Sequence, residues 1–472
     1  MTQPSQLRNS FAADTVPLPR QAAWPTREPE PPDDAPSLTP GTALLGVYEG
    51  GGYDEPRYLV SRGDGQMVLI SRMLNAVASA LDGKRSLEQV AEEASRHYGA
   101  ELNADAVRYL VENKLRPLGL ATMGIPDAPA PKANPLLALS LRFVLMPGWM
   151  VRRVAAFFAP MFRPPVIVLV LAALLAMDVW LLATGRVGAS IHLSVGSPGL
   201  MLTIMGVVIA GSVFHEFGHA AGCHYGGGKP AQIGVGVLIV VPAFYTNVND
   251  AYRLDRRGRL RTDLGGIYFN AIFAVFLGAL CLWTGFPALP AIIVMVHIQM
   301  MQQLLPLVRM DGYYILGDLV GVPNLFEQIR PIIRHSLLRK PPERAVTNLR
   351  RKTRIVITAW VSLVVPALVL ALVNLAIFVP GYFRTAVQSM SVYYREGLAA
   401  FDNGSVSGVL LAVVSVIILL VPWVGISTMV VRTTAKIVFA VNRRLARRRK
   451  AASAPDRGGD GGLPAPEFQR AE

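Results

Sequence analysis

Charged residues are scarce in this chain of 472 residues: Asp, Glu, Lys and Arg together make up 17%, against about 25% in soluble domains. Apolar types reach 52%, and the mean hydropathy is +0.38. This composition excludes a disordered chain and an ordinary soluble enzyme. Cysteine is nearly absent as well. The two that occur, Cys223 and Cys281, lie in or beside apolar stretches and exclude a disulfide framework.

Long uncharged runs, in contrast, are plentiful and predict the membrane spans. Five stretches hold at most one charged residue: Pro164–Gly185, which contains Asp178, Val187–Phe214, Leu264–Val308, Ile355–Phe383 and Asn403–Val431. A helix needs about 20 apolar residues to cross a bilayer, so the run at 264–308 holds two spans. The sequence predicts a mainly α, polytopic membrane protein with about six transmembrane helices, near residues 165–185, 199–222, 264–284, 290–308, 355–380 and 407–431.

Basic residues are nearly missing from alternate loops. With both termini inside, the three outer loops hold Arg186, Arg384 and Arg395, and the other 43 of the 46 Lys and Arg residues lie on the inner side or its edge. This asymmetry is the positive-inside pattern. We therefore expect a multi-pass protein of the plasma membrane with both termini cytoplasmic. The formal charge of +14 then needs no nucleic-acid partner.

The segments outside the spans differ in composition and in the structure that they predict. Residues 1–40 hold nine prolines and no apolar core of a signal peptide, which predicts a disordered tail. Residues 41–123 predict a small winged-helix-like α+β cytosolic domain, with a hairpin at 58–70 and helices at 71–81, from 86 and at 104–118. A linker and an interfacial helix occupy 124–163. The membrane domain covers 164–431, and a basic, disordered tail covers 432–472.

The domain at 41–123 resembles the peptide-recognition domain of enzymes that mature ribosomally made peptides, typified by the D protein of pyrroloquinoline-quinone biosynthesis. The resemblance rests on Leu-Asp-Gly-Lys-Arg-Ser-Leu-Glu-Gln-Val at 81–90, on Tyr98-Gly99 and on Val111–Leu120. It implies that a leader peptide adds as a strand beside the hairpin. A docking or regulatory module is the alternative. DNA binding is disfavoured, because the charges of this segment are mixed.

One motif carries the chemistry. The second span ends in His215-Glu216-Phe217-Gly218-His219. Residues i and i+4 of a helix share a face, so both imidazoles can reach one Zn²⁺ with Glu216 beside them as a general base. Glu216 is the only glutamate between residues 113 and 326, and an ionisable residue within a span indicates a functional site.

Two histidines do not complete a catalytic zinc site, which usually has three protein ligands and one open position. The candidates for the third ligand are Asp311, His224, His297 and Asp250. Asp311 lies at the inner end of the fourth predicted span, at the depth expected for the histidines. It also follows Pro306, which can end a helix. We therefore favour Asp311.

Three elements in order make the chain resemble the site-2 protease family of intramembrane zinc metalloproteases. They are the motif at 215–219, Gly-Ile-Tyr-Phe-Asn at 266–270, and Gln-Leu-Leu-Pro-Leu-Val-Arg-Met-Asp-Gly at 303–312. Asp-Gly-Tyr-Tyr-Ile-Leu-Gly-Asp at 311–318 and Pro-Ala-Phe-Tyr at 242–245 resemble the bacterial peptide-metalloprotease branch. The resemblance covers roughly residues 45–330. The chain departs from it at Gln303, where the family has Asn.

The resemblance implies the roles of the site residues. His215, His219 and Asp311 hold Zn²⁺, which lowers the pKa of a bound water toward about 7. Glu216 takes the proton of that water and later protonates the leaving amine. Asn270, and less clearly Gln303, would bind the substrate backbone or the oxyanion. A polar contact between helices is the alternative role for Asn270.

An apolar segment at 233–244 is too short to span as a helix, and we expect a re-entrant, extended segment there. Its free edge could hold a substrate as an added strand.

The predicted function is that of an intramembrane zinc metalloendopeptidase. It would cut a precursor peptide, in the maturation of a ribosomally made peptide whose leader is bound by the N-terminal domain. One alternative is regulated proteolysis of a membrane-anchored signalling protein. Another is a membrane protein that binds a peptide, for immunity or export, without cutting it. The predicted partners are a peptide or membrane-protein substrate and the lipid bilayer, without nucleic acid.

Overall fold

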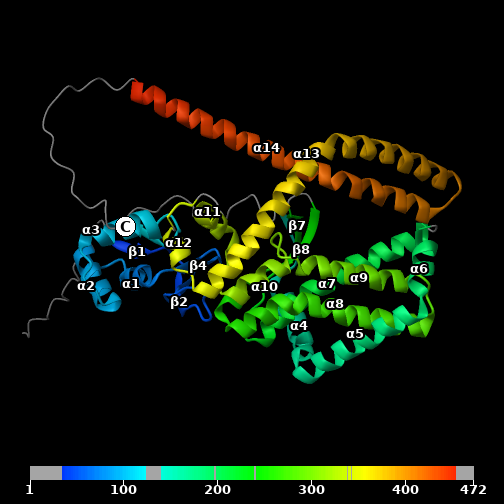
Figure 1. Cartoon of the computed structure of the whole chain (residues 1–472), viewed down its shortest axis with the longest axis horizontal. Coiled ribbons are helices and arrows are strands. Elements are labelled where there is room, and N and C mark those ends of the chain that lie inside the picture. The colour runs from blue at the N-terminus through cyan, green and yellow to red at the C-terminus, as the bar shows by residue number, and fades with distance from the viewer. Residues whose placement is uncertain are drawn as a thin grey trace, which may run out of the picture. The chain divides into compact units, whose positions relative to one another are not determined.

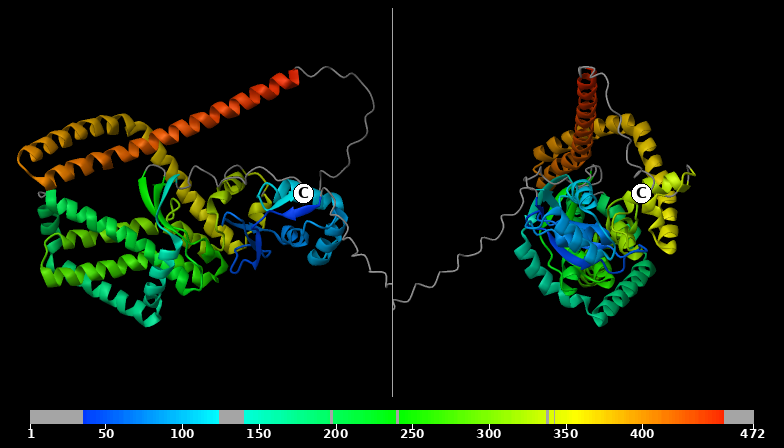
Figure 2. Two further views of the ribbon diagram at one scale, coloured as in Figure 1. Left: turned by 180° about the vertical axis from the view of Figure 1, so that it is seen from behind. Right: turned by 90° about the vertical axis from the view of Figure 1, so that its left-hand side faces the viewer.

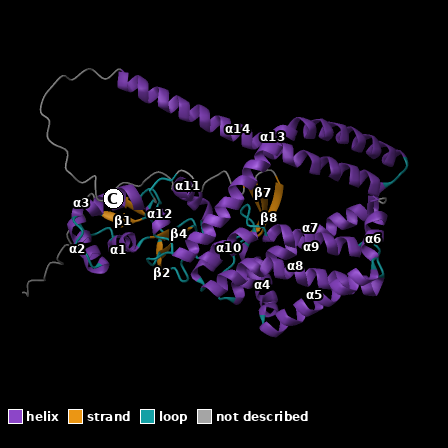
Figure 3. Cartoon of the chain, in the orientation of Figure 1, coloured by secondary structure: helices purple, strands orange, loops and turns teal. Residues whose placement is uncertain are grey.

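A computed structural model of the protein describes residues 35–123, 140–195, 198–238, 241–336, 339–341 and 343–452. Helices dominate it (Figure 1, Figure 3). The chain divides into two compact units. The first joins residues 1–40 with 76–129, and the second joins residues 41–75 with 130–472.

The smaller unit is built on short helices. Strand β1 (Pro36–Leu38) pairs antiparallel with β5 (Ala121–Met123), so part of the tail predicted at 1–40 is ordered structure. Residues 1–34 lie outside the described residues. The helices are α1 (Arg72–Ala80, of which this unit holds the part from Ala76), α2 (Leu87–Tyr98) and α3 (Ala104–Leu110), and α3 runs into a π-helical turn at Val111–Leu115.

The helix predicted from residue 86 is confirmed as α2, and a capping box fixes its start. The Ser86 side chain accepts a hydrogen bond from the backbone N–H of Gln89, and the Gln89 side chain accepts one from the backbone N–H of Ser86. The third helix ends earlier than predicted, because the π-turn closes it before Gly119.

The larger unit begins with an antiparallel sheet. Strands β2 (Ala43–Val47), β3 (Tyr58–Ser61) and β4 (Met67–Ile70) lie in the order β2-β3-β4. The hairpin predicted at 58–70 is β3–β4, with Tyr58 opposite Ile70. Since this sheet clusters with the residues from 130 onward while α2 and α3 do not, the winged-helix-like domain stays a prediction.

Among the described residues, five helices are long and apolar enough to cross a membrane: α5 (Pro164–Thr184), α7 (Pro198–Tyr225), α8 (Arg256–Thr284), α13 (Arg351–Asp402) and α14 (Val406–Ala452). They coincide with five of the six predicted spans. The sixth, predicted at 290–308, is the shorter apolar helix α9 (Leu289–Leu304). It ends there because Pro306 disfavours a helical Leu305, which is extended.

Helices α5, α8 and α9 pack through one apolar cluster, with Leu181, Leu277 and Ile292 all buried, and α7 lies beside α8 (Figure 1, Figure 2). The remaining helices are α6 (Arg186–Val195), α10 (Asp311–Val320), α11 (Leu325–Ser336), α12 (Arg344–Thr347) and the 3₁₀ turn η3 (Asn249–Arg253).

A second sheet lies between α7 and α8 in the sequence. Strands β7 (Ile233–Leu238) and β8 (Val241–Thr246) form an antiparallel hairpin, which confirms the extended segment predicted there. Strand β6 (Ser140–Met146) pairs with the other side of β7.

The interfacial helix predicted between 136 and 162 was therefore partly wrong. Its first part is β6, because the backbone groups of β7 in an apolar setting need a strand on each side. Its second part is α4 (Gly148–Phe158), followed by the 3₁₀ turn η2 (Ala159–Phe162).

Candidate metal centre

Helix α7 places the two histidines of the motif side by side. His215 and His219 are one turn apart, and their Nε2 atoms lie 3.1 Å from each other. Both rings are largely shielded from solvent, with 4% and 12% of the side chains exposed. The helix therefore presents two imidazole nitrogens at one point, as the spacing of the motif predicts.

The third group comes from a distant part of the chain. Asp311 is the first residue of α10. Its Oδ2 lies 3.1 Å from His215 Nε2 and its Oδ1 lies 3.4 Å from His219 Nε2. One side-chain atom from each of the three residues lies within 4.8 Å of the other two.

The loop between α9 and α10 delivers Asp311 to this point. Pro306 follows the end of α9, and its carbonyl oxygen accepts a 2.7 Å hydrogen bond from Trp360 Nε1 on α13. Gly312 then lets the first turn of α10 pass close to the end of α9, because a Cβ there would lie 2.2 Å from the Leu304 carbonyl oxygen. The position of Asp311 is thus fixed by backbone packing.

Glycines also bring α8 against the histidines. A Cβ on Gly218 would lie 2.2 Å from the Gly265 carbonyl oxygen, so α7 and α8 touch through backbone at this crossing. A Cβ on Gly266 would lie 2.3 Å from His215 Cε1 and 2.5 Å from His219 Nε2. The imidazoles therefore occupy the space that any side chain at position 266 would need.

The hydrogen bonds leave lone pairs facing one another. The Thr262 carbonyl oxygen lies 2.8 Å from His219 Nδ1 and can only accept, so Nδ1 carries the proton and Nε2 of the neutral ring is a bare acceptor. Asp311 Oδ2 is buried without a hydrogen-bond partner among the described residues.

Two imidazoles and one carboxylate are a ligand set that suits zinc and leaves a fourth position for water or substrate. The unpartnered, buried Asp311 Oδ2 beside two imidazole nitrogens is the observation that makes a cation fit here, since converging lone pairs in a buried site repel one another unless a cation lies between them. These three residues could hold one zinc ion.

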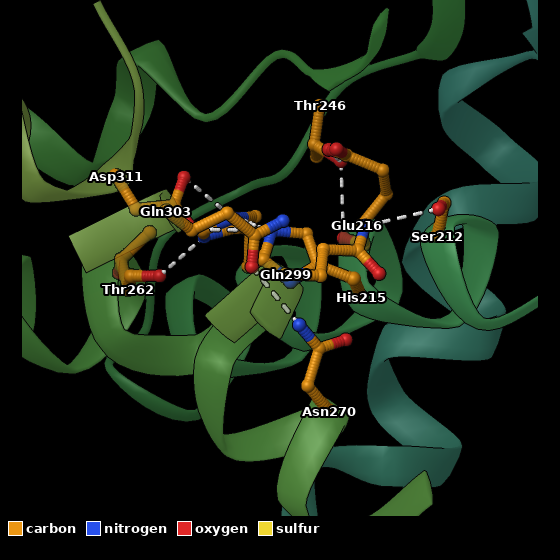
Figure 4. Close-up of polar contacts among 10 residues, drawn as sticks. Ser212, His215, Glu216, Thr246, Thr262, Asn270, Gln299, Gln303 and Asp311 are labelled. Carbon is orange, nitrogen blue, oxygen red and sulfur yellow. Dashed lines mark hydrogen bonds and ion pairs between the residues drawn. The ribbon is translucent and has the colours of Figure 1, made fainter. Parts of the chain in front are cut away.

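Glu216 lies beside the triad and is oriented by a strand. Only 8% of this residue is exposed. The Thr246 hydroxyl, at the end of β8, donates a 2.7 Å hydrogen bond to Glu216 Oε2 (Figure 4). One carboxylate oxygen is thereby held, and the other, Oε1, stays available as a proton acceptor.

The two predicted substrate-binding amides contact each other. Asn270 on α8 donates a 2.9 Å hydrogen bond from Nδ2 to Gln303 Oε1 on α9. Gln303 Nε2 in turn lies 3.5 Å from His215 Nε2. The Gln303 amide therefore reaches the histidine pair. Both side chains border the site, and Asn270 is committed to an interhelical contact.

The other candidate ligands lie apart from the triad. Asp250 accepts a 2.8 Å hydrogen bond from the backbone N–H of Lys229. His297 Nε2 lies 3.3 Å from Asp178 Oδ1, which gives the unassigned aspartate of the first span a partner. His224 lies in the last turn of α7 and is not part of the cluster around the three ligand atoms in the described residues.

Sequence reasoning missed Thr246 and Thr262. Thr262 contributes a carbonyl oxygen, which every residue has, so its type gives no signal. Thr246 lies 30 positions from Glu216, and only the pairing of β7 with β8 brings it there. Gly218 and Gly265 carry a signal that was available, namely small residues on two apolar helices.

Comparison of the chain with known proteins gave no match to a family model, to a curated protein or to a solved structure.

Proposed function

We propose that this protein is an intramembrane zinc metalloendopeptidase. The observation that carries the proposal is the convergence of His215, His219 and Asp311 beside Glu216. The three sequence elements that resemble the site-2 protease family support the same activity. A structural role alone would not require a buried glutamate beside two imidazoles with free lone pairs.

The residues divide the chemistry between them. A zinc ion held by the triad would supply Lewis-acid polarisation and an activated water. Glu216 accepts the proton of the attacking water at Oε1 and returns it to the leaving nitrogen, and the hydroxyl of Thr246 holds Oε2 during both transfers. The Gln303 amide, beside His215, is placed to donate to the oxygen that gains charge at the scissile carbonyl.

The sheet beside Glu216 would present the substrate. In the order β6-β7-β8, β8 is an edge strand among the described residues, and it ends at Thr246. A peptide added to this edge would be extended, so its scissile bond would be accessible, whereas a helix hides it.

The substrate we propose is a precursor peptide. The leader-binding likeness of residues 41–123 supports a ribosomally made peptide. We further propose that both termini lie in the cytoplasm. Cleavage of a membrane-anchored regulator and peptide binding without cleavage are the alternatives.

The test measures zinc and cleavage in the same preparations. Zinc per chain is determined in detergent-purified wild type, Glu216→Gln and Asp311→Ala, and cleavage of candidate precursors is followed in cells. We expect about one zinc per chain in wild type and Glu216→Gln and a loss of zinc in Asp311→Ala. Cleavage should be lost in both variants, because Glu216→Gln removes the base and Asp311→Ala removes a ligand.

Asp250→Ala is the matched control. It removes a carboxylate that pairs with the Lys229 backbone N–H, and it should keep both zinc and cleavage. Wild type without zinc in chelator-free buffer would overturn the metalloprotease. Zinc retained together with undiminished cleavage in Glu216→Gln would overturn the assigned base.

A further inference from the structure

A second charged cluster lies at the far end of the helix that carries Asp311. Asp318 is on α10, seven residues after Asp311, and two helical turns return a side chain to the same face. Asp318 Oδ1 accepts a 2.9 Å hydrogen bond from Arg259 Nε on α8. Both residues are buried, with 1% of Arg259 and 7% of Asp318 exposed.

The spacing on α8 mirrors the spacing on α10. Arg259 and Gly266, which packs on the histidine rings, are also seven residues apart on one helix. Helices α8 and α10 therefore come together at two positions that are two helical turns apart. At the first position both helices contact the histidines of α7, and at the second they contact each other directly. The metal triad with Gly266 forms one point, and the Arg259–Asp318 pair forms the other.

A chain segment that precedes the first span also contacts the Arg259–Asp318 pair. Tyr48, which is 3% exposed, follows β2 and donates a 3.1 Å hydrogen bond to the same Asp318 Oδ1. The Arg259 guanidinium lies over the Tyr48 ring, 4.3 Å from its centroid, and Arg259 Nη2 donates to the Glu49 carbonyl oxygen at 2.9 Å. Burial raises the pKa of the Tyr48 hydroxyl, so it stays a neutral donor.

Backbone hydrogen bonds also hold this segment against the C-terminal end of α10. Gly52 N–H donates a 2.9 Å hydrogen bond to the Gly321 carbonyl oxygen, and Gly52 accepts one from the Arg350 N–H at 3.0 Å. A Cβ on Gly52 would lie 2.0 Å from the Val320 carbonyl oxygen. The segment Tyr48–Gly52 therefore packs closely against the end of α10, and position 52 has no room for a side chain.

We propose that the segment Tyr48–Gly52, with Arg259 and Asp318, is a positioning device for the metal centre. It locks α10 against α8 and so holds Asp311 at the distance from His215 and His219 that zinc needs. Tyr48, Arg259 and Asp318 are positioning residues and touch neither zinc nor substrate. This inference rests on the proposed zinc site.

The buried pair is suited to this task. A buried guanidinium whose carboxylate is removed is left uncompensated, which is far costlier than the loss of an exposed pair. Asp263 also lies beside Asp318, so without Arg259 two carboxylates would face each other. The docked arrangement of α8 and α10 supplies Asp318 with both of its partners, Arg259 and Tyr48.

The experiment compares the zinc dissociation constants of wild type, Tyr48→Phe and Asp318→Asn, measured by chelator competition in detergent. Tyr48→Phe keeps the ring over Arg259 and removes only the hydroxyl. Tyr58→Phe is the matched control, because it removes a hydroxyl from β3 of the same sheet, at a position paired with Val47 and Ile70. We expect zinc binding about tenfold weaker in Tyr48→Phe, weaker still in Asp318→Asn, and unchanged in Tyr58→Phe.

A spectroscopic readout separates positioning from loss of fold. Cobalt(II) bound in place of zinc absorbs visible light according to its coordination geometry. Tyr48→Phe should shift this spectrum while the circular dichroism of the metal-free protein matches that of wild type. A wild-type zinc constant and cobalt spectrum in both Tyr48→Phe and Asp318→Asn would overturn the inference and leave the zinc site intact. If wild type itself binds no zinc, it is the proposed function that fails.

Discussion

At the scale of single residues, glycine, which has no side chain, shapes the candidate metal centre as much as the residues that could hold the ion. Gly266 leaves the space that the imidazoles of His215 and His219 fill. Since a packed interior relaxes only partly around added atoms, an extra methyl group there must displace one of the two imidazoles or the helix that carries them. The glycine is therefore as much a part of the proposed zinc site as the carboxylate of Asp311.

Gly266→Ala should accordingly weaken zinc binding. The added Cβ would lie 2.3 Å from His215 Cε1, and overpacking of this kind costs about 1–3 kcal/mol, or about thirtyfold in affinity at the middle of that range. Chelator competition measures the change. Gly206→Ala, on α7, is the control, since a Cβ there meets nothing within 4 Å. Equal zinc affinity in the two variants would contradict this account.

The sequence predicted the residues of the site better than their contacts. His215, Glu216 and His219 follow from helical spacing, and Asp311 follows from matching depths in the membrane. The orientation of Glu216 by Thr246 and the contact of Asn270 with Gln303 do not follow, because both depend on the distance between separate elements. Periodicity describes one element at a time and carries no information on such distances.

At the scale of elements, the loop between α9 and α10 is the least regular part of the centre and the most constrained. Trp360 on α13 is 4% exposed, packs edge-on against Phe326 and tilted against Tyr313, and donates a hydrogen bond from Nε1 to the Pro306 carbonyl oxygen. A helix far along the chain thus holds the segment that presents Asp311.

Trp360→Phe should destabilise this loop. It removes the hydrogen bond to Pro306 and part of a buried ring, a loss of about 1–3 kcal/mol. We expect a thermal midpoint several degrees lower and a smaller stabilisation by added zinc, both measured by thermal unfolding in detergent. Trp283→Phe, where the ring is 84% exposed at the end of α8, should change neither quantity. If Trp360→Phe unfolded at the wild-type thermal midpoint both with and without zinc, the role given to this loop would be refuted.

Element boundaries show where sequence patterns stop being informative. The ends of α5 and α8 fall at Gly185 and Gly285, both with positive φ, and close to the predicted limits. Helix α13 instead runs for 52 residues, about 78 Å, although the hydrocarbon core is only about 30 Å thick. Loss of apolar character ends a membrane span but does not end a helix, so the sequence predicted the span and missed the rest of α13.

At the scale of the whole molecule, the distribution of charge predicts the orientation. The proposed arrangement places Arg395 outside and Lys352 inside, although both belong to α13. The native cysteines, Cys223 and Cys281, are free and buried, so cysteines introduced by mutation can be labelled selectively.

A thiol reagent that does not cross membranes should label Arg395→Cys in intact cells. It should label Lys352→Cys only after the membrane is broken, because positive charge is retained on the inner side. Gel shifts of the labelled protein measure both reactions. The reverse pattern would invert the proposed topology, and labelling of both sites in intact cells would show that α13 does not cross.

The positioning device that joins Tyr48 to Asp318 has a consequence for the order in which the site forms during synthesis. Its two halves are 270 positions apart, so at about 5–20 residues per second the second emerges on the order of tens of seconds after the first. His215 and Glu216 are made within that interval, before Asp311 exists to complete a zinc site. The proposed peptidase, built in this order, would have no assembled centre with which to cut its neighbours at the ribosome or itself.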